Sequence, residues 1–157
     1  MSMSLLLKLR KQRIERLMTE LQHAKTAIKI AQEAVEQAET EFSDYKMWRV
    51  KEEKLMFNAL HGGNFSADKM RGYNATLDRL KEKQIKLEGV IPGRKIELEK
   101  SVQTFDSVQK KLQEATKKKE KIDEFLKVEE EQELKVEEMV EEEVIDELNC
   151  FQQYSSK

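Results

Sequence analysis

The sequence predicts an all-α protein, a long antiparallel two-helix coiled-coil hairpin whose second helix is longer and kinked near Pro92. Apolar residues recur at alternating steps of three and four over residues 14–45, and a second run over residues 70–126 fits one heptad register. Such heptad spacing is typical of helices that pack along a narrow seam. With one Pro and five Gly in the whole chain, little besides helix is expected.

The composition fits a rod better than a globular core. Charged residues make up 38% of the 157-residue chain, and hydrophobic residues also make up 38%. Ordinary domains carry about 25% charged and about 45–50% apolar residues. Because two paired helices need apolar side chains only along their seam, we expect one coiled-coil domain over residues 1–157.

The first helix is expected to span residues 4–61. Ser4 is a favourable N-cap residue, and Gly62-Gly63 supplies the left-handed residue that commonly ends a helix. Its seam residues are Ile14, Leu17, Leu21, Ala24, Ile28, Ala31, Val35, Ala38, Phe42 and Tyr45.

The second helix is expected to span residues 66–148, after a turn at 62–65 and before a flexible tail at 149–157. Ser66 is the expected N-cap, Asp68 suits the first turn, and Phe65 with Met70 has the spacing of a hydrophobic staple. Its seam residues are Met70, Tyr73, Leu77, Leu80, Leu87, Ile91, Leu98, Phe105, Val108, Leu112, Ala115, Ile122 and Leu126.

The two seams predict one pairing register. The numbers of facing residues add up to 129, as for Leu21 with Val108 and Phe42 with Leu87, and the midpoint of this register falls inside the predicted turn. Small residues then face large ones, which lets side chains interdigitate, in the pairs Ala24–Phe105, Ala31–Leu98 and Ala38–Ile91.

Two features of the second helix leave alternatives open. Pro92, between Gly89 and Gly93, indicates either a kink that preserves the register or a loop that creates a third helix. Beyond about residue 125 the second helix has no facing residue in the first. The apolar stripe there is either part of a solvated tail or a docking segment, and it consists of Val136, Val140, Val144 and Leu148.

The heptad pattern fails after Tyr45. Arg49 and Glu52 occupy the next seam positions, and the expected stripe shifts sideways to Trp48 and Leu55. Three further apolar residues fall at outward-facing positions, namely Met47, Val50 and Phe57. They are scattered surface hydrophobes, or residues that repack locally around Phe65, or a partner site on the hairpin tip.

The open end of the predicted hairpin is basic. Its cations are Lys8, Arg10, Lys11, Arg13, Lys117, Lys118 and Lys119. Arg10 and Lys119 face each other in the predicted register, and like charges there weaken pairing. We therefore expect this end to splay or to receive an acidic partner surface.

Several function classes are disfavoured. His23 and His61 lack the spacing of metal ligands, and neither a phosphate-binding loop nor a nucleophile motif occurs, so we expect no enzyme and no cofactor. No aromatic residue is interleaved with the basic residues, which argues against nucleic acid. The lone Cys150 suits a reducing cytosol, and no stretch is apolar enough for membrane insertion.

The chain resembles the type III secretion stalk proteins, YscO-type in injectisomes and FliJ-type in flagella. The residues that carry the resemblance are Asp44-Tyr45 and Trp48 late in the first helix, Tyr73, Leu77 and Leu80 early in the second, and the basic start Lys8-Leu9-Arg10-Lys11. The helix–turn–long-helix plan covers the whole chain.

The resemblance implies a cytoplasmic component of an export apparatus that is associated peripherally with the membrane-embedded machinery. Such proteins contact a secretion ATPase hexamer, here expected through the basic open end. Their tips contact the cytosolic domain of the export gate, and some bind secretion chaperones. Tyr45 and Tyr73 match the tip aromatics of the family, and Leu80 matches more loosely.

Other readings of the sequence are a holdase-type coiled-coil chaperone that binds clients at its tip, a general coiled-coil scaffold, and a nucleic-acid arm that uses the basic end. A holdase would suppress aggregation of unrelated proteins. Nucleic-acid binding would weaken steeply with salt.

Overall fold

The structure, a computed structural model, describes residues 2–63 and 66–155. Two helices account for the described chain, α1 (Met3–His61) and α2 (Ala67–Ser155), with no strand among these residues. The predicted all-α two-helix hairpin is therefore confirmed, and α2 is the longer helix with 89 residues against 59. Phe65 of the predicted staple lies outside the described residues.

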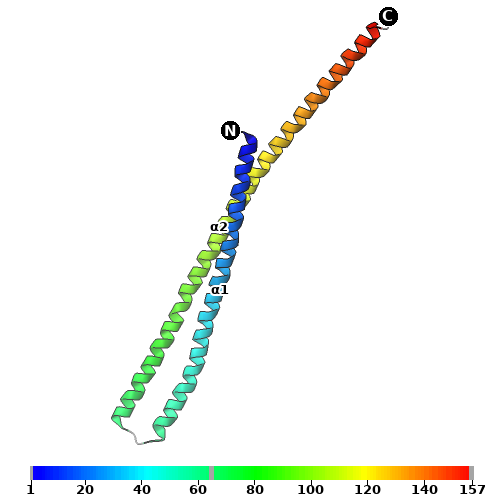
Figure 1. The fold of residues 1–157 in the computed structure, drawn as a ribbon. Coiled ribbons are helices and arrows are strands. Elements are labelled where there is room, and N and C mark those ends of the chain that lie inside the picture. The colour runs from blue at the N-terminus through cyan, green and yellow to red at the C-terminus, as the bar shows by residue number, and fades with distance from the viewer. Residues whose placement is uncertain (1, 64–65, 156–157) are drawn as a thin grey trace. The chain divides into compact units, whose positions relative to one another are not determined.

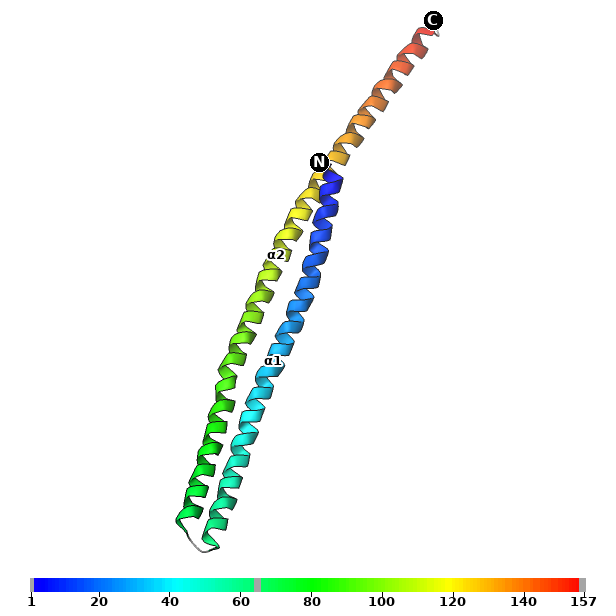
Figure 2. The same cartoon turned by 60° about the vertical axis from the view of Figure 1, so that its left-hand side comes forward.

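The chain divides into two structural units, each of which contains part of both helices. The hairpin unit comprises residues Glu20–Gln109, and the open-end unit comprises the residues up to Thr19 together with those from Lys110 onward. In the hairpin unit, α1 and α2 run antiparallel, side by side, and are joined at the turn (Figures 1 and 2).

The core of the hairpin unit is the predicted seam. Its buried residues all come from that seam and are Ala24, Val35, Ala38, Tyr45 and Val108. The other predicted seam residues of this unit are half-buried, except Met70 near the turn, which is 38% exposed. A two-helix pair covers each residue from one side, and accordingly none of the described side chains is less than 2% exposed.

Two cross-helix hydrogen bonds fix the pairing near the turn. The hydroxyl of Tyr45 donates to the backbone carbonyl of Leu80 (3.0 Å), and Nη1 of Arg49 donates to Oε1 of Gln84 (2.7 Å). In the predicted register Tyr45 faces Gln84 and Arg49 faces Leu80, and the residue numbers of each facing pair add up to 129. Each bond joins a residue of α1 to the α2 residue one turn away from the one that it faces, which is compatible with that register.

The expected sideways shift of the stripe after Tyr45 is wrong. Arg49 and Glu52 stay in the seam and are half-buried, while Trp48 is 47% and Leu55 64% exposed. The heptad phase continues because the Arg49 guanidinium finds partners there: Nε forms a 2.7 Å ion pair with Glu53 in addition to the bond to Gln84. A satisfied cation can therefore occupy a seam position.

The helix ends differ from the prediction in two respects. α1 begins before Ser4, because Ser2 is the cap: its Oγ accepts from the backbone N–H of Leu5 (3.2 Å). The expected left-handed glycine is wrong too, since neither Gly62 nor Gly63 has a positive φ. Instead, the N–H of Gly62 continues the helical pattern by donating to Asn58. At α2, the Ser66 hydroxyl accepts from the N–H of Lys69 (3.2 Å), as expected of an N-cap.

Pro92 lies inside α2, which continues through it without interruption. The alternative of a third helix is therefore wrong. Proline lacks an N–H and deprives the carbonyl of Glu88 of its helical donor. Both residues lie on the exposed side of α2, where water can take the place of the missing donor. The predicted bend of α2 at this proline remains a prediction.

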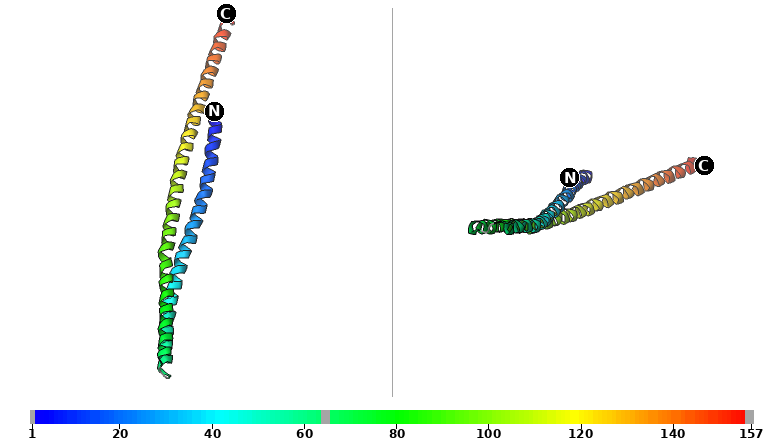
Figure 3. Two further views of the ribbon diagram at one scale, coloured as in Figure 1. Left: turned by 90° about the vertical axis from the view of Figure 1, so that its left-hand side faces the viewer. Right: turned by 90° about the horizontal axis from the view of Figure 1, so that it is seen from below.

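In the open-end unit, the first residues of α1 pair with α2, and α2 then extends beyond them (Figure 3). Leu17, Ala115 and Ile122 are buried in this pairing. Every residue from 127 to 153 is exposed. The expected end of the second helix at residue 148 is wrong, because α2 remains helical to Ser155. The flexibility of the tail from residue 149 stays a prediction.

Candidate partner-binding surfaces

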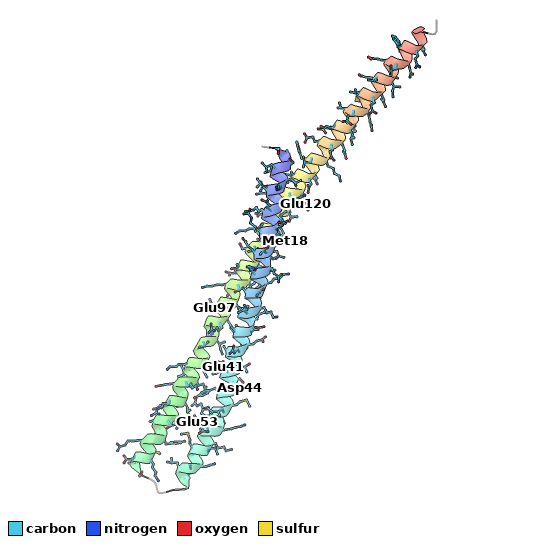
Figure 4. All side chains as sticks on the ribbon, in the orientation of Figure 1. Met18, Glu41, Asp44, Glu53, Glu97 and Glu120 are labelled. Atoms are coloured by element: carbon cyan, nitrogen blue, oxygen red, sulfur yellow. The ribbon has the colours of Figure 1, made fainter. Side chains whose placement is uncertain are left out.

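The hairpin unit carries a shallow hollow beside Tyr45. It has a volume of about 540 Å³ and is lined by Glu41, Asp44, Tyr45, Trp48, Lys83 and Leu87. Glu41 and Asp44 project from neighbouring turns of α1 (Figure 4). Heptad geometry explains this grouping, because residues three and four apart on a helix lie on one face. The hollow therefore combines an aromatic wall with two carboxylates.

The aromatic wall of this hollow consists of Tyr45 and Trp48. Their ring centroids are 5.5 Å apart with the planes tilted by 36°. The ammonium of Lys83 on α2 lies 5.1 Å from the centroid of the Tyr45 ring, within the range of a cation–π contact. Tyr45 is only 9% exposed, whereas Trp48 is 47% exposed. Trp48 is thus the aromatic side chain that a partner can reach.

The residues predicted for the tip separate into two groups. Tyr45 is buried, and Tyr73 and Leu80 are half-buried in the seam, so these three hold the two helices together. The others are exposed apolar side chains, namely Met47, Trp48, Val50 and Phe57. The outward positions predicted for Met47, Val50 and Phe57 are therefore confirmed, whereas Trp48, expected in the shifted stripe, is exposed instead.

The exposed tip residues do not form one patch. At about 100° per residue around the helix axis, Trp48 and Val50 point about 160° apart. Val50 and Phe57 lie two turns apart on one side of α1, where Phe57 packs edge-on against His61 with centroids 4.3 Å apart. Trp48 lies on the other side with the hollow. We therefore treat the Trp48 hollow as the candidate tip surface.

A second hollow lies next to the turn. Its volume is about 370 Å³, and its lining includes Met56, Leu60, Lys69, Gly72 and Tyr73. A Cβ added to Gly72 would meet no described heavy atom within 4 Å. Tyr73, which is half-buried, lines this hollow.

Several polar residues around these surfaces were missed in the sequence. Gln84 is a half-buried seam residue, and Glu53 is the ion-pair partner of Arg49. The signal was available, because Gln84 stands seven residues after Leu77 in the same heptad phase. A heptad pattern drawn from apolar residues alone leaves out Gln84, because its side chain is polar.

The predicted basic residues of the open-end unit also separate into two groups. Arg10 and Lys119 are half-buried, as the register requires of facing seam residues, while the others are exposed, namely Lys8, Lys11, Arg13, Lys117 and Lys118. Lys119 approaches Asp123 on its own helix at 3.9 Å. The Nε of Arg10 is buried and has no hydrogen-bond partner among the described residues. Two like charges thus face each other across the seam, and one of them carries an unsatisfied donor. We refer to this facing pair as the Arg10–Lys119 level.

Two kinds of feature are absent from the described residues. Over residues 2–63 and 66–155, no helix is long and apolar enough to cross a membrane. The same part of the chain contains no group of three or more His, Cys, Asp or Glu side chains placed to hold a metal ion.

The two long helices and their heptad seam place the protein in the class of coiled-coil proteins. A family model described as "Type III secretion protein YscO" matches residues 3–149. Because this match covers almost the entire chain, the protein belongs to the YscO family of type III secretion proteins. The resemblance inferred from the sequence is thereby confirmed, and the chain is a type III secretion component.

A solved structure supports the fold independently. The chain is similar to the 2.8 Å crystal structure of type III secretion protein YscO from Vibrio parahaemolyticus, with a TM-score of 0.77 at 22% sequence identity. The similarity covers 90% of this chain and 91% of the other. No curated protein matches the sequence significantly.

Proposed function

We propose that the protein is a non-enzymatic, stalk-like partner of a secretion ATPase hexamer and connects this ATPase to the cytosolic domain of the export gate. Secretion chaperones are further candidate partners. The protein would act in the cytoplasm, bound peripherally to the membrane-embedded apparatus. Membership of the YscO family and the presence of two distinct candidate surfaces in different units support this proposal.

The proposed ATPase contact rests on the two facing cations of the Arg10–Lys119 level. The buried Nε of Arg10 lacks a partner, and an unsatisfied buried donor costs about 1–3 kcal/mol. A carboxylate from another protein would satisfy this donor and offset the repulsion with Lys119. The proposed role of these two residues is therefore to receive an acidic surface of the ATPase. The exposed lysines and arginines around them add long-range attraction.

The ATPase contact can be tested with the full-length protein and its cognate secretion ATPase, by measuring hydrolysis and hexamer formation. We expect stimulation by the parent protein and weaker stimulation by the double variant Arg10→Leu with Lys119→Leu. The matched control is Lys25→Leu, an exposed cation on α1 outside this level. Absence of binding and stimulation by the parent protein at micromolar concentration would contradict the proposal.

The double variant distinguishes partner binding from folding. Removing two facing like charges should raise the melting temperature, while binding to the ATPase weakens. A merely structural role for Arg10 would instead leave stimulation unchanged at temperatures where all variants are folded. Loss of both stability and stimulation would assign Arg10 to the pairing of the helices.

The Trp48 hollow is the proposed gate contact. Its lining holds an aromatic wall, two carboxylates (Glu41 and Asp44) and one ammonium (Lys83). Because the carboxylates outnumber the ammonium, the hollow suits a partner side chain with an apolar stem and a positive head. Trp48→Ala should weaken binding to the cytosolic gate domain in isothermal calorimetry without changing helicity, because Trp48 is exposed. Leu55→Ala is the control, since Leu55 is exposed on the same side of α1 but does not line the hollow. An equal loss of gate binding in the two variants would contradict this assignment.

A holdase chaperone is the second candidate, favoured by the exposed apolar residues Met47, Val50 and Phe57. Such a protein would suppress heat-induced aggregation of unrelated proteins. A dedicated stalk would bind its partners and leave that aggregation unchanged.

A further inference from the structure

The C-terminal part of α2 carries an apolar stripe that has no counterpart in α1. Val136, Val140, Val144 and Leu148 are between 50% and 58% exposed. They repeat every four residues, so they follow one another along one side of the helix over about 18 Å, at about 1.5 Å per residue. Met139 and Phe151, both exposed, flank this stripe. An apolar ridge of this length facing water is an expected interaction site.

The charge around the stripe restricts what can cover it. From Asp123 to Glu147 the helix holds thirteen acidic residues and two lysines. A second copy of the same segment would bring an equal negative charge, in parallel or antiparallel pairing alike. An anionic lipid surface would be repelled for the same reason. The electrostatically complementary occupant is a protein surface rich in Lys and Arg.

The spacing of the stripe also predicts how it packs against a partner helix. Seam residues of α1 and α2 follow heptad steps of three, four or seven, whereas this stripe uses steps of four alone. A ridge of residues four apart fits the corresponding groove of another helix at an interaxial angle of about −50°. Such a crossing differs from the near-parallel contact of a coiled coil. The stripe therefore does not extend the hairpin seam but suits a short oblique contact.

We propose that residues 136–148 of α2 dock by this stripe onto another protein, in an apolar helix-lined groove whose rim carries Lys and Arg. The apolar ridge supplies the contact area, and the glutamates beside it pair with the basic rim. This contact is separate from the Arg10–Lys119 level and from the Trp48 hollow. It stands whether or not the protein binds a secretion ATPase.

The test uses full-length protein and a defined probe, a labelled synthetic helical peptide with Leu on one face and Lys elsewhere. Fluorescence anisotropy measures its binding. We expect Val140→Ser with Val144→Ser to weaken binding about tenfold or more, as loss of two apolar contacts implies. The control is Leu134→Ser with Ile145→Ser, which removes two exposed apolar residues located about 100–120° from the middle of the stripe. This control pair should retain parent affinity.

A second pair of variants tests the charge. Glu137→Gln with Glu141→Gln neutralises carboxylates beside the stripe and should reduce the dependence of peptide binding on salt. Glu138→Gln with Glu142→Gln makes the same change in net charge on the far side of the helix and should reduce it less. Circular dichroism establishes that all variants remain helical.

Three outcomes would overturn the proposal. The first is an equal loss of peptide affinity in the stripe variant and its apolar control. The second is equally tight binding of a peptide with Glu in place of Lys. The third is self-association of the parent protein in sedimentation velocity that the stripe variant abolishes, because the occupant would then be a second copy.

Discussion

The hydroxyl of Tyr45 on α1 donates a 3.0 Å hydrogen bond to the backbone carbonyl of Leu80 on α2. A helical carbonyl has two lone pairs, so Leu80 can accept this bond without giving up its place in the helix. The bond joins a seam aromatic to the opposite backbone and leaves the ring wall facing the Trp48 hollow. Tyr45 thereby connects the pairing of the helices to the shape of the candidate gate surface.

Tyr45→Phe removes this hydrogen bond and keeps the ring. We expect the free energy of unfolding to fall by about 0.5–1.5 kcal/mol, the usual net contribution of one hydrogen bond. Urea unfolding followed by circular dichroism measures it. Tyr73→Phe is the control, because the described contacts of that half-buried tyrosine include no hydrogen bond of its hydroxyl. Equal losses in both variants would show that the Tyr45–Leu80 bond adds nothing.

Arg49 and Gln84 form the second cross-helix bond, at 2.7 Å. Arg49→Leu alone should cost about 1–3 kcal/mol, because the amide of Gln84 loses its partner in a half-buried seam. The double variant with Gln84→Leu should recover this loss, since two leucines make an apolar seam level. Thermal unfolding of the two single variants and the double variant measures the coupling. Additive effects would mean that the two side chains do not interact in solution.

Ala31 is a half-buried seam residue that faces Leu98 in the 129 register. Ala31→Phe should overpack this level and reduce stability by about 1–3 kcal/mol. Ala27→Phe adds the same volume one turn earlier at an exposed residue beside the seam and should reduce stability less. An unchanged melting temperature for Ala31→Phe would contradict the pairing at this level.

Pro92 lies in the interior of α2 on its exposed side. Pro92→Ala should stabilise the hairpin by up to about 3 kcal/mol, because proline is that unfavourable inside a helix. Gly89→Ala calibrates the gain from helix propensity alone, at about 0.5–1 kcal/mol. A Cβ at Gly89 meets no described atom within 4 Å. A Pro92→Ala gain no larger than that of Gly89→Ala would indicate that α2 accommodates the proline without cost.

Most of the fold followed from the heptads, because burial in a two-helix pair depends on one periodic face. Every residue that is buried in the structure had been assigned to the seam. The errors arose where a polar group took an apolar position or where local geometry had several solutions. Arg49 looked like a break in the pattern, yet its cross-helix partner, Gln84, lies 35 residues away and is visible only once the helices are paired.

The helix ends were less predictable for a related reason. Ser2 and Ser4 are equally good capping residues, and the choice between them depends on which backbone N–H groups remain unpaired. The same applies to Gly62, whose N–H bonds to Asn58 in ordinary helical fashion. The candidate surfaces required side-chain positions, because residues adjacent in sequence, such as Met47 and Trp48, point in different directions.

The pairing register also sets how the hairpin assembles in time. Facing residues near the turn, such as Tyr45 and Gln84, are separated by a short stretch of chain, whereas Arg10 and Lys119 are separated by more than a hundred residues. Closing a loop costs more entropy as the loop lengthens, so pairing should begin at the turn and proceed like a zipper. The residues paired farthest from the turn, including Arg10 and Lys119, would then pair last and separate first. Fluctuations there would let an incoming partner insert without unfolding the rest of the molecule.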